Sequence, residues 1–145
     1  MIDESDAHTQ APDLKGRRAI ITGGTTGIGR AIAVLLASEG VKVFVCGRTP
    51  DHLGDALQRI SEVGEGDGMN VDLSIAEDVD RFFEAANAFL GGIDIAVINA
   101  AVPAAALAES GENEARYQLD TDFNAYLICA QEAARRMEGG SDIIF

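Results

Sequence analysis

The chain has 145 residues, and its 24 acidic against 11 basic side chains give a formal net charge of -13. This length, with 47% hydrophobic residues, fits one folded domain and excludes a disordered or fibrous protein. Because the charge repels phosphate backbones and anionic lipid surfaces, we expect neither a nucleic-acid nor a membrane partner.

The first segment, residues 1–16, is polar, acidic and aperiodic, so we expect a flexible tail without an assigned function. It has neither the basic nor the apolar region of a signal peptide, and no apolar run in the sequence is long enough to span a membrane. Cys46 and Cys129 lie in apolar patterns typical of buried thiols. We therefore predict a cytoplasmic protein with no metal site.

The next segment predicts a strand, a glycine turn and a helix. The strand covers residues 18–21 and runs into Thr22-Gly23-Gly24-Thr25-Thr26-Gly27-Ile28-Gly29. A helical face follows, with a stop at Gly40, and we expect its packing residues to be Ile28, Ile32, Leu35 and Leu36.

Two further strand–helix units follow. Residues 41–46 predict a strand, and a helix opens at Thr49-Pro50, with Leu53, Leu57 and Ile60 on one face and a stop at Gly64. Residues 68–71 predict a weak third strand. The next helix is indicated by the capping box Ser74-Ile75-Ala76-Glu77 and should pack through Val79, Phe82, Phe83, Ala86 and Leu90 before Gly91-Gly92 ends it.

The last third of the chain repeats the alternation. Residues 93–98 predict a fourth strand, residues 99–110 a loop of small residues, and residues 112–137 a long helix before a fifth strand begins at Asp142. Short apolar strands separated by helices favour a parallel sheet with right-handed crossovers and helices on both faces. The predicted fold is a doubly wound, Rossmann-like α/β sheet over residues 17–145.

The glycine turn is the first candidate site. In such a sheet ligands bind at the carboxyl ends of the strands, where backbone amides and the start of the first helix face a phosphate group. A side chain at Gly23 or Gly27 would obstruct the turn or the ligand, and one at Gly29 would hold the helix off the strand. The sequence has neither the Gly-x-Gly-x-x-Gly spacing nor a P-loop lysine. The predicted binding residues in this turn are Gly23, Thr25, Thr26, Gly27, Ile28 and Gly29.

Arg48 is the second candidate, directly after the second predicted strand. An acidic residue there would bind the ribose 2′-hydroxyl of NAD, whereas arginine pairs with the 2′-phosphate of NADP. The sequence therefore favours NADP(H). Thr49 could add a hydroxyl to the same phosphate, although a helix-cap role explains it equally. An S-adenosylmethionine-dependent methyltransferase shares the glycine turn but generally has an acid where Arg48 stands.

These motifs together resemble the short-chain dehydrogenase/reductase family. The resemblance rests on Thr-Gly-x-x-x-Gly-x-Gly, Gly47-Arg48, Asp72-Leu73, Asn99-Ala100-Ala101 and Asn124, in that order. It implies that Asp72 and Leu73 flank the adenine, with the Asp72 carboxylate accepting from its amino group; a helix N-terminal charge is the alternative. It also implies that Asn99 braces the sheet near the cofactor, where Ala101 replaces the family's glycine and narrows the wall.

The resemblance assigns one catalytic position, Asn124, which would hold a water in the proton relay. The family's catalytic serine and its Tyr-x-x-x-Lys have no counterpart, because Tyr117 and Tyr126 are followed four residues later by Thr121 and Ala130. The expected activity is hydride transfer between NADP(H) and a small carbonyl or alcohol, with this chain alone inactive.

Two readings of this chain remain open. The predicted fifth strand ends at an open edge, and the long helix offers apolar residues without a partner, which indicates part of a longer polypeptide or a complex. The alternative is a non-catalytic nucleotide-binding or regulatory module. The family also implies a homo-oligomer. Residues 102–110 could line one wall of a substrate pocket or form a plain surface loop.

Overall fold

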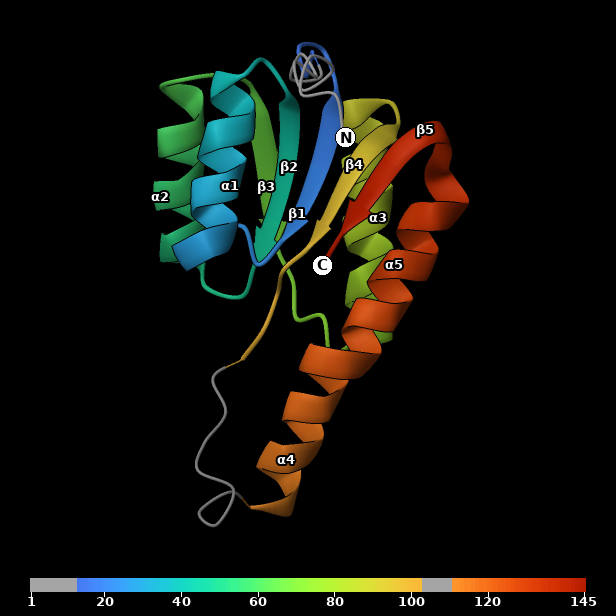
Figure 1. The fold of residues 1–145 in the computed structure, drawn as a ribbon. Coiled ribbons are helices and arrows are strands. Elements are labelled where there is room, and N and C mark those ends of the chain that lie inside the picture. Colours follow the sequence, from blue (N-terminus) through green and yellow to red (C-terminus); the bar gives the residue numbers. More distant parts are fainter. Residues whose placement is uncertain (1–12, 103–110) are drawn as a thin grey trace, which may run out of the picture.

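The computed structural model describes residues 13–102 and 111–145, and within them five parallel strands form one sheet in the order β3-β2-β1-β4-β5 (Figure 1). The strands are β1 (Arg18–Thr22), β2 (Lys42–Gly47), β3 (Gly66–Asn70), β4 (Ile93–Ile98) and β5 (Met137–Ile144). The helices are α1 (Gly27–Ser38), α2 (Pro50–Ser61), α3 (Ala76–Leu90), α4 (Glu112–Leu119) and α5 (Ala125–Arg136), with a π-helical turn η2 (Asp120–Asn124) joining the last two. The predicted doubly wound α/β fold is confirmed.

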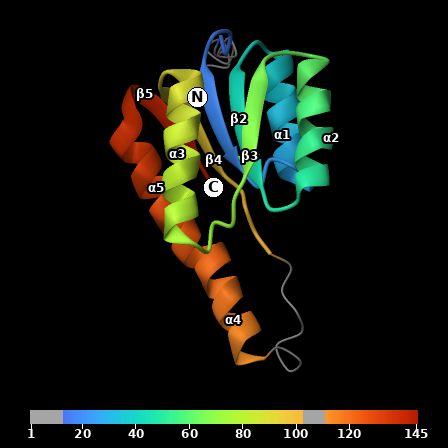
Figure 2. The same cartoon turned by 180° about the vertical axis from the view of Figure 1, so that it is seen from behind.

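The sheet separates two apolar layers. Helices α1 and α2 cover one face and α3 and α5 the other, as the front and back views show (Figures 1 and 2). Side chains alternate along each strand, so Ile20 packs toward α3 and α5 while Ala19 and Ile21 pack toward α1 and α2. Such burial on both faces explains the continuous apolar runs in the sequence.

The predicted packing face is correct for α3 and only partly correct for α1. All the apolar residues expected on α3 are buried. On α1, Ile28 and Leu35 are exposed, and the buried residues are Gly29, Ala33 and Ala37. Small side chains at the buried positions let α1 lie close to the sheet. The larger Ile32 and Leu36 are therefore only partly buried, at the edge of the contact between helix and sheet.

Two boundaries also differ from the prediction. Strand β3 begins at Gly66, earlier than expected. Helix α3 has Ile75 as its N-cap, without a side-chain cap, so the predicted capping box does not form. Instead, the Ser74 hydroxyl donates to Asp72 Oδ1 at 2.7 Å, and the Asp72 amide donates to Asp78 Oδ2 at 2.8 Å. The acidic residues here organise the turn after β3 and leave the helix end uncapped.

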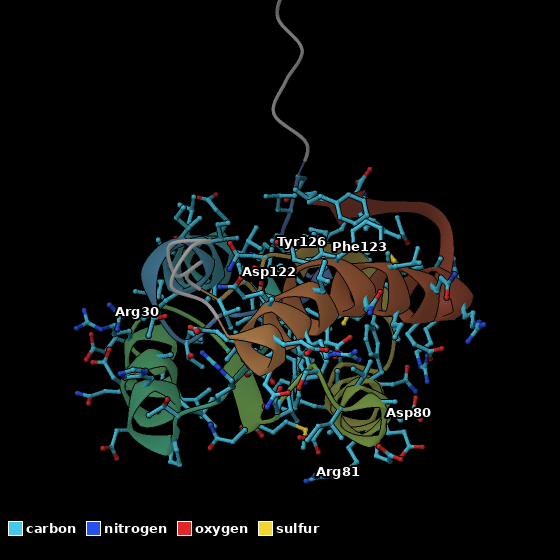
Figure 3. All side chains as sticks on the ribbon, turned by 90° about the horizontal axis from the view of Figure 1, so that it is seen from below. Arg30, Asp80, Arg81, Asp122, Phe123 and Tyr126 are labelled. Atoms are coloured by element: carbon cyan, nitrogen blue, oxygen red, sulfur yellow. The ribbon has the colours of Figure 1, made fainter. Side chains whose placement is uncertain are left out.

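The predicted long helix is present but interrupted. Its residues divide into α4, the π turn and α5, and α4 projects beyond the carboxyl edge of the sheet (Figure 1). Phe123 and Tyr126 lie on one side of this helix (Figure 3), where Phe123 is exposed and Tyr126 stacks on Phe145 with ring centroids 6.2 Å apart. The strand predicted from Asp142 begins earlier, at Met137, and its pairing with β4 is irregular between Ile93 and Ile95.

The described end of the predicted N-terminal tail contacts the folded domain. Leu14 packs against the layer under α1 and α2, and the Gly16 amide donates to the Gly40 carbonyl at 2.9 Å. The rest of that tail, residues 1–12, lies outside the described residues, as does most of the predicted loop, residues 103–110. Among the helices described, none is both long and apolar enough to cross a membrane.

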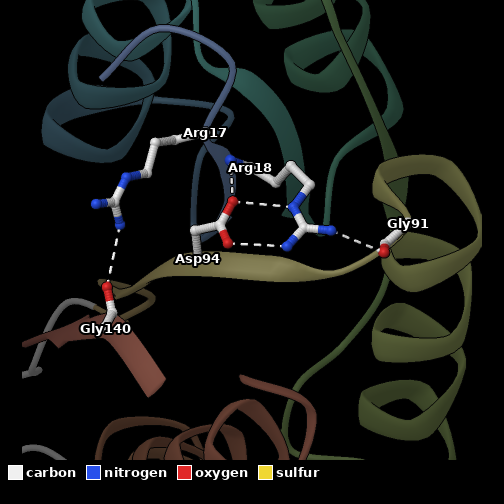
Figure 4. Close-up of polar contacts among 5 residues, drawn as sticks. All are labelled: Arg17, Arg18, Gly91, Asp94 and Gly140. Carbon is white, nitrogen blue, oxygen red and sulfur yellow. Dashed lines mark hydrogen bonds and ion pairs between the residues drawn. The ribbon is translucent and has the colours of Figure 1, made fainter. Parts of the chain in front are cut away.

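A bidentate ion pair joins the amino ends of β1 and β4 (Figure 4). The Arg18 guanidinium donates to both Asp94 oxygens at 2.8 and 2.9 Å, and the Arg18 amide donates to Asp94 Oδ2 at 2.9 Å. Arg18 also donates to the Gly91 carbonyl at 2.8 Å. The Arg18 hydrogen bond, against the opposing effect of burial, holds the pKa of Asp94 below its ordinary value.

We expect Asp94→Asn to destabilise the protein at neutral pH. A carboxylate with a lowered pKa in the folded state stabilises it above the ordinary pKa, and this stabilisation is lost as pH falls through the folded value. The free energy of unfolding in urea should therefore fall by about 1 kcal/mol at neutral pH and by much less at an acid pH below the folded-state pKa of Asp94. Asp80→Asn, an exposed position on α3, is the matched control. An equal loss at both pH values would contradict this.

Candidate nucleotide-binding site

A cleft of about 570 Å³ lies at the carboxyl edge of the sheet. Strands β1 and β4 are neighbours there, and the chain leaves them toward opposite faces, which is the point where doubly wound sheets bind ligands. The glycine turn after β1, the ends of β2 and β4, the segment after β3 and one residue of the π turn surround it. The predicted residues that line it are Gly23, Thr25, Thr26, Gly27, Ile28, Arg48, Thr49, Asp72, Leu73, Asn99, Ala100 and Ala101.

The glycines of the turn differ in what an added side chain would meet. Gly23 has a φ of +63°, and a Cβ on it would lie 2.8 Å from the Ala100 Cα. Gly29 does not line the cleft; a Cβ there would lie 2.2 Å from the Gly23 carbonyl oxygen, inside contact distance. At Gly27, with a φ of +52°, a Cβ would meet no atom within 4 Å, so it would project into free space. The turn is therefore tightly packed against its neighbours at Gly23 and Gly29, and it is open at Gly27, which lines the cleft.

The start of α1 is suited to an anion. Thr26 is the N-cap but makes no side-chain cap, and the first turn carries no acidic residue. The first amides of a helix have no intrahelical acceptor and sit at the positive end of the helix dipole. A phosphate group in the cleft could accept from them.

Asn99 holds β4 against the glycine turn. Its amide and that of Ala100 donate to the Thr22 hydroxyl at 2.9 and 3.1 Å, and its Nδ2 lies 3.3 and 3.4 Å from the carbonyl oxygens of Thr22 and Gly23. These bonds join neighbouring strands at their carboxyl ends. The bracing role that the family resemblance implies for Asn99 agrees with this geometry.

Arg48 and Asp72 bring opposite charges to the end of the cleft beside β2 and β3. They are the one cation and the one carboxylate among the described residues that line it. Burial favours a raised pKa for Asp72, but hydrogen bonds from Ser74 and Tyr117 and the charge of Arg48 outweigh it, so the pKa lies below its ordinary value. Asp72 is therefore an anion at neutral pH, able to accept from an amino group. Thr49 is the N-cap of α2 but forms no side-chain cap, which leaves its hydroxyl available.

Several cleft residues were not predicted. Thr121, from the π turn, is 5% exposed and lines the cleft, and its hydroxyl is the one buried side-chain polar atom without a partner in the described part of the chain. Asp122, beside it, accepts from the Val102 amide at 2.8 Å and so ties the loop after β4 to the same turn. His52 and Cys46 also line the cleft. A π turn is frequent at functional sites but has no signature in one sequence.

Asn124, the predicted catalytic residue, lies elsewhere. It is exposed, it is not among the cleft-lining residues, and its Nδ2 donates to Asp120 Oδ1 at 2.8 Å. The structure therefore does not bring Asn124 together with the other predicted residues. Its catalytic role stays a prediction.

Neither cysteine has the features of a nucleophile or a ligand. Burial raises the pKa of both Cys46 and Cys129 to about 12, so both are thiols at neutral pH. In the residues that the structure describes, no group of three or more His, Cys, Asp or Glu side chains could hold a metal ion.

A second groove, of about 610 Å³, lies between α1 and α2. Its cations, Arg30 and Arg59, are both paired with Asp55. It lies between two helices, remote from most of the strand ends, and neither of its arginines is left unpaired. We therefore assign the site to the cleft at the carboxyl edge.

Comparison with known proteins agrees with this geometry. The family model described as short chain dehydrogenase matches residues 17–145. The chain is 34% identical, over 142 residues, to NADPH-dependent aldehyde reductase 1, chloroplastic, of Arabidopsis thaliana, covering 90% of this chain and 49% of that protein. It is 31% identical, over 122 residues, to 3beta-hydroxysteroid dehydrogenase of Mediterraneibacter gnavus, covering 82% of this chain and 44% of that protein.

The solved structures are similar in the same region. A short chain dehydrogenase from Burkholderia cenocepacia in complex with NADP superposes with a TM-score of 0.84 at 28% identity, over 90% of this chain and 55% of that one. A short-chain dehydrogenase/reductase from Serratia marcescens gives a TM-score of 0.83, also at 28% identity and with the same coverage. The chain spans about half the length of the curated relatives it matches.

Proposed function

Because the chain belongs to the short-chain dehydrogenase family, we propose that it forms the NADP(H)-binding part of an oxidoreductase that transfers hydride between the nicotinamide and a carbonyl or alcohol. When the cofactor is bound, its nicotinamide supplies or accepts the hydride. The described residues bind and orient the cofactor.

The position of Arg48 carries the choice of NADP(H). It follows β2, the strand whose carboxyl end meets the adenosine ribose in this fold, and it is the one cation on the described cleft wall. A guanidinium can pair with a phosphate through two parallel hydrogen bonds, which a ribose hydroxyl cannot match. The NADP complex of the Burkholderia structure and the NADPH dependence of the Arabidopsis relative support the same cofactor.

The reaction also needs a proton on the carbonyl oxygen as the hydride arrives. Burial, and then the charge of Asp122, raises the pKa of Tyr126, which is the wrong direction for a proton donor at neutral pH. Tyr117 is engaged with Arg48 and Asp72 at the adenosine end. We therefore assign no proton donor within the described residues and expect this chain alone to bind NADPH but to turn over about 100-fold or more below an enzyme with a donor.

The test follows the hydride itself. NADPH carrying deuterium at the transferable position is incubated with the purified protein and a panel of aldehydes and ketones, and the alcohols are analysed by mass spectrometry. Deuterium on the carbinol carbon supports the proposed oxidoreductase. Because turnover without a donor is expected to be at least about 100-fold slow, incubation times are extended by more than about 10,000-fold relative to an enzyme with a donor; NADPH binding with no transfer even then would instead support a non-catalytic nucleotide-binding module. The cytoplasmic location and the homo-oligomer stay predictions.

A further inference from the structure

Tyr117 connects the projecting helix α4 to the two charged residues of the cleft. It accepts a hydrogen bond from Arg48 Nη1 at 2.6 Å, and its hydroxyl lies 3.2 and 3.4 Å from the two oxygens of Asp72. The Arg48 guanidinium also lies 5.7 Å from the centre of the Tyr117 ring. Residues that follow β2 and β3 and a residue of α4 therefore meet at one end of the cleft.

The Tyr117 hydroxyl stands between the two charges. It accepts from the guanidinium and can donate its own proton to the carboxylate, so both bonds are satisfied at once. No ion pair joins Arg48 to Asp72 in the described residues. A direct pair between them would offset the positive charge of Arg48, and its donors would be occupied. With the hydroxyl between them, most of the guanidinium N–H groups stay free.

We propose that Tyr117 is a positioning residue for cofactor selectivity, which holds Arg48 at the cleft edge with its charge available to the 2′-phosphate of NADP(H). This inference rests on the proposed function. It adds a selectivity residue from a helix that carries none of the predicted cofactor-binding residues. Tyr117 acts through Arg48, and loss of its hydroxyl lets Arg48 turn toward Asp72.

The test compares two probes that differ only in the 2′-phosphate. Dissociation constants for 2′,5′-ADP and for 5′-AMP are measured by calorimetry for the purified protein and for Tyr117→Phe. The hydroxyl contributes hydrogen bonds to charged groups, so we expect about tenfold weaker binding of 2′,5′-ADP and less than about twofold change for 5′-AMP. Tyr126→Phe, at a tyrosine outside the cleft-lining residues, should change neither.

A double variant tests the route through Arg48. In an Arg48→Ala background, Tyr117→Phe should have no further effect on 2′,5′-ADP, because the residue it positions is gone. An equal loss of both probes in Tyr117→Phe would mean a structural role only and would overturn the inference. Unchanged binding of both probes in Tyr117→Phe would also overturn the inference.

The outcomes also separate this inference from the proposed function. A wild-type protein that binds 2′,5′-ADP no better than 5′-AMP overturns the choice of NADP(H) and the role of Tyr117 together. A wild-type preference that Arg48→Ala removes but Tyr117→Phe leaves intact overturns only the role of Tyr117.

Discussion

Replacing Gly29 with alanine should abolish tight NADPH binding and destabilise the fold. The added Cβ would lie 2.2 Å from the Gly23 carbonyl oxygen and 2.5 Å from Asn99 Nδ2. Neither contact can relax freely, because the Gly23 oxygen belongs to the backbone of the glycine turn and Asn99 braces β4 against β1. The start of α1 must move outward, and the turn moves with it.

The expected losses of stability and of NADPH affinity in Gly29→Ala follow from overpacking of the turn. Forcing a methyl group into such a contact costs about 1–3 kcal/mol of unfolding free energy, and an equal loss of binding free energy at the displaced turn weakens NADPH binding about 5- to 150-fold. Urea unfolding and a fluorescence titration with NADPH measure the two effects. Gly54→Ala is the matched control, since a Cβ there meets nothing within 4 Å and alanine favours the helix. A Gly29→Ala protein with wild-type stability and affinity would show that the packing of the turn is not required.

Replacing Arg48 with alanine should remove the preference for NADPH over NADH. We expect NADPH to bind about 100-fold more weakly, because a bidentate, charge-assisted pair with the 2′-phosphate is lost. Affinity for NADH, which lacks that phosphate, should change little. Titration of both cofactors at constant ionic strength measures the ratio, since added salt weakens the pair.

The control for Arg48 is an arginine of the next helix that lies outside the cleft. Arg59 of α2 is paired with Asp55 at 3.0 Å and does not line the site. Arg59→Ala should leave both affinities unchanged. Equal weakening of NADPH and NADH in Arg48→Ala would indicate a general disturbance of the cleft and would contradict the assignment of the 2′-phosphate to this residue.

Much of the fold follows from the sequence, because its elements are strongly patterned. The apolar strands β1, β2 and β4 and the amphipathic helix α3 were predicted nearly to the residue. The packing face of α1 was predicted only in part, because hydrophobic periodicity gives the greatest weight to large apolar residues. A helix that must approach a sheet closely instead buries Gly29, Ala33 and Ala37.

The candidate site, like the fold, could be predicted from the sequence only in part. Residues of the turn after β1, and those that follow β2, β3 and β4, were predicted because the carboxyl ends of parallel strands meet at one edge. Tyr117, Thr121 and Asp122 were missed, because their positions depend on how α4 and the π turn lie against that edge. One residue on a long helix gives no local signal of such a contact.

The most direct test is equilibrium titration of the purified wild-type protein with NADPH and, separately, with NADH. If the glycine turn holds the pyrophosphate and Arg48 the 2′-phosphate, both cofactors bind and NADPH binds at least about tenfold more tightly. Equal or tighter binding of NADH would contradict the role of Arg48. No binding of either cofactor would contradict the assignment of the cleft itself.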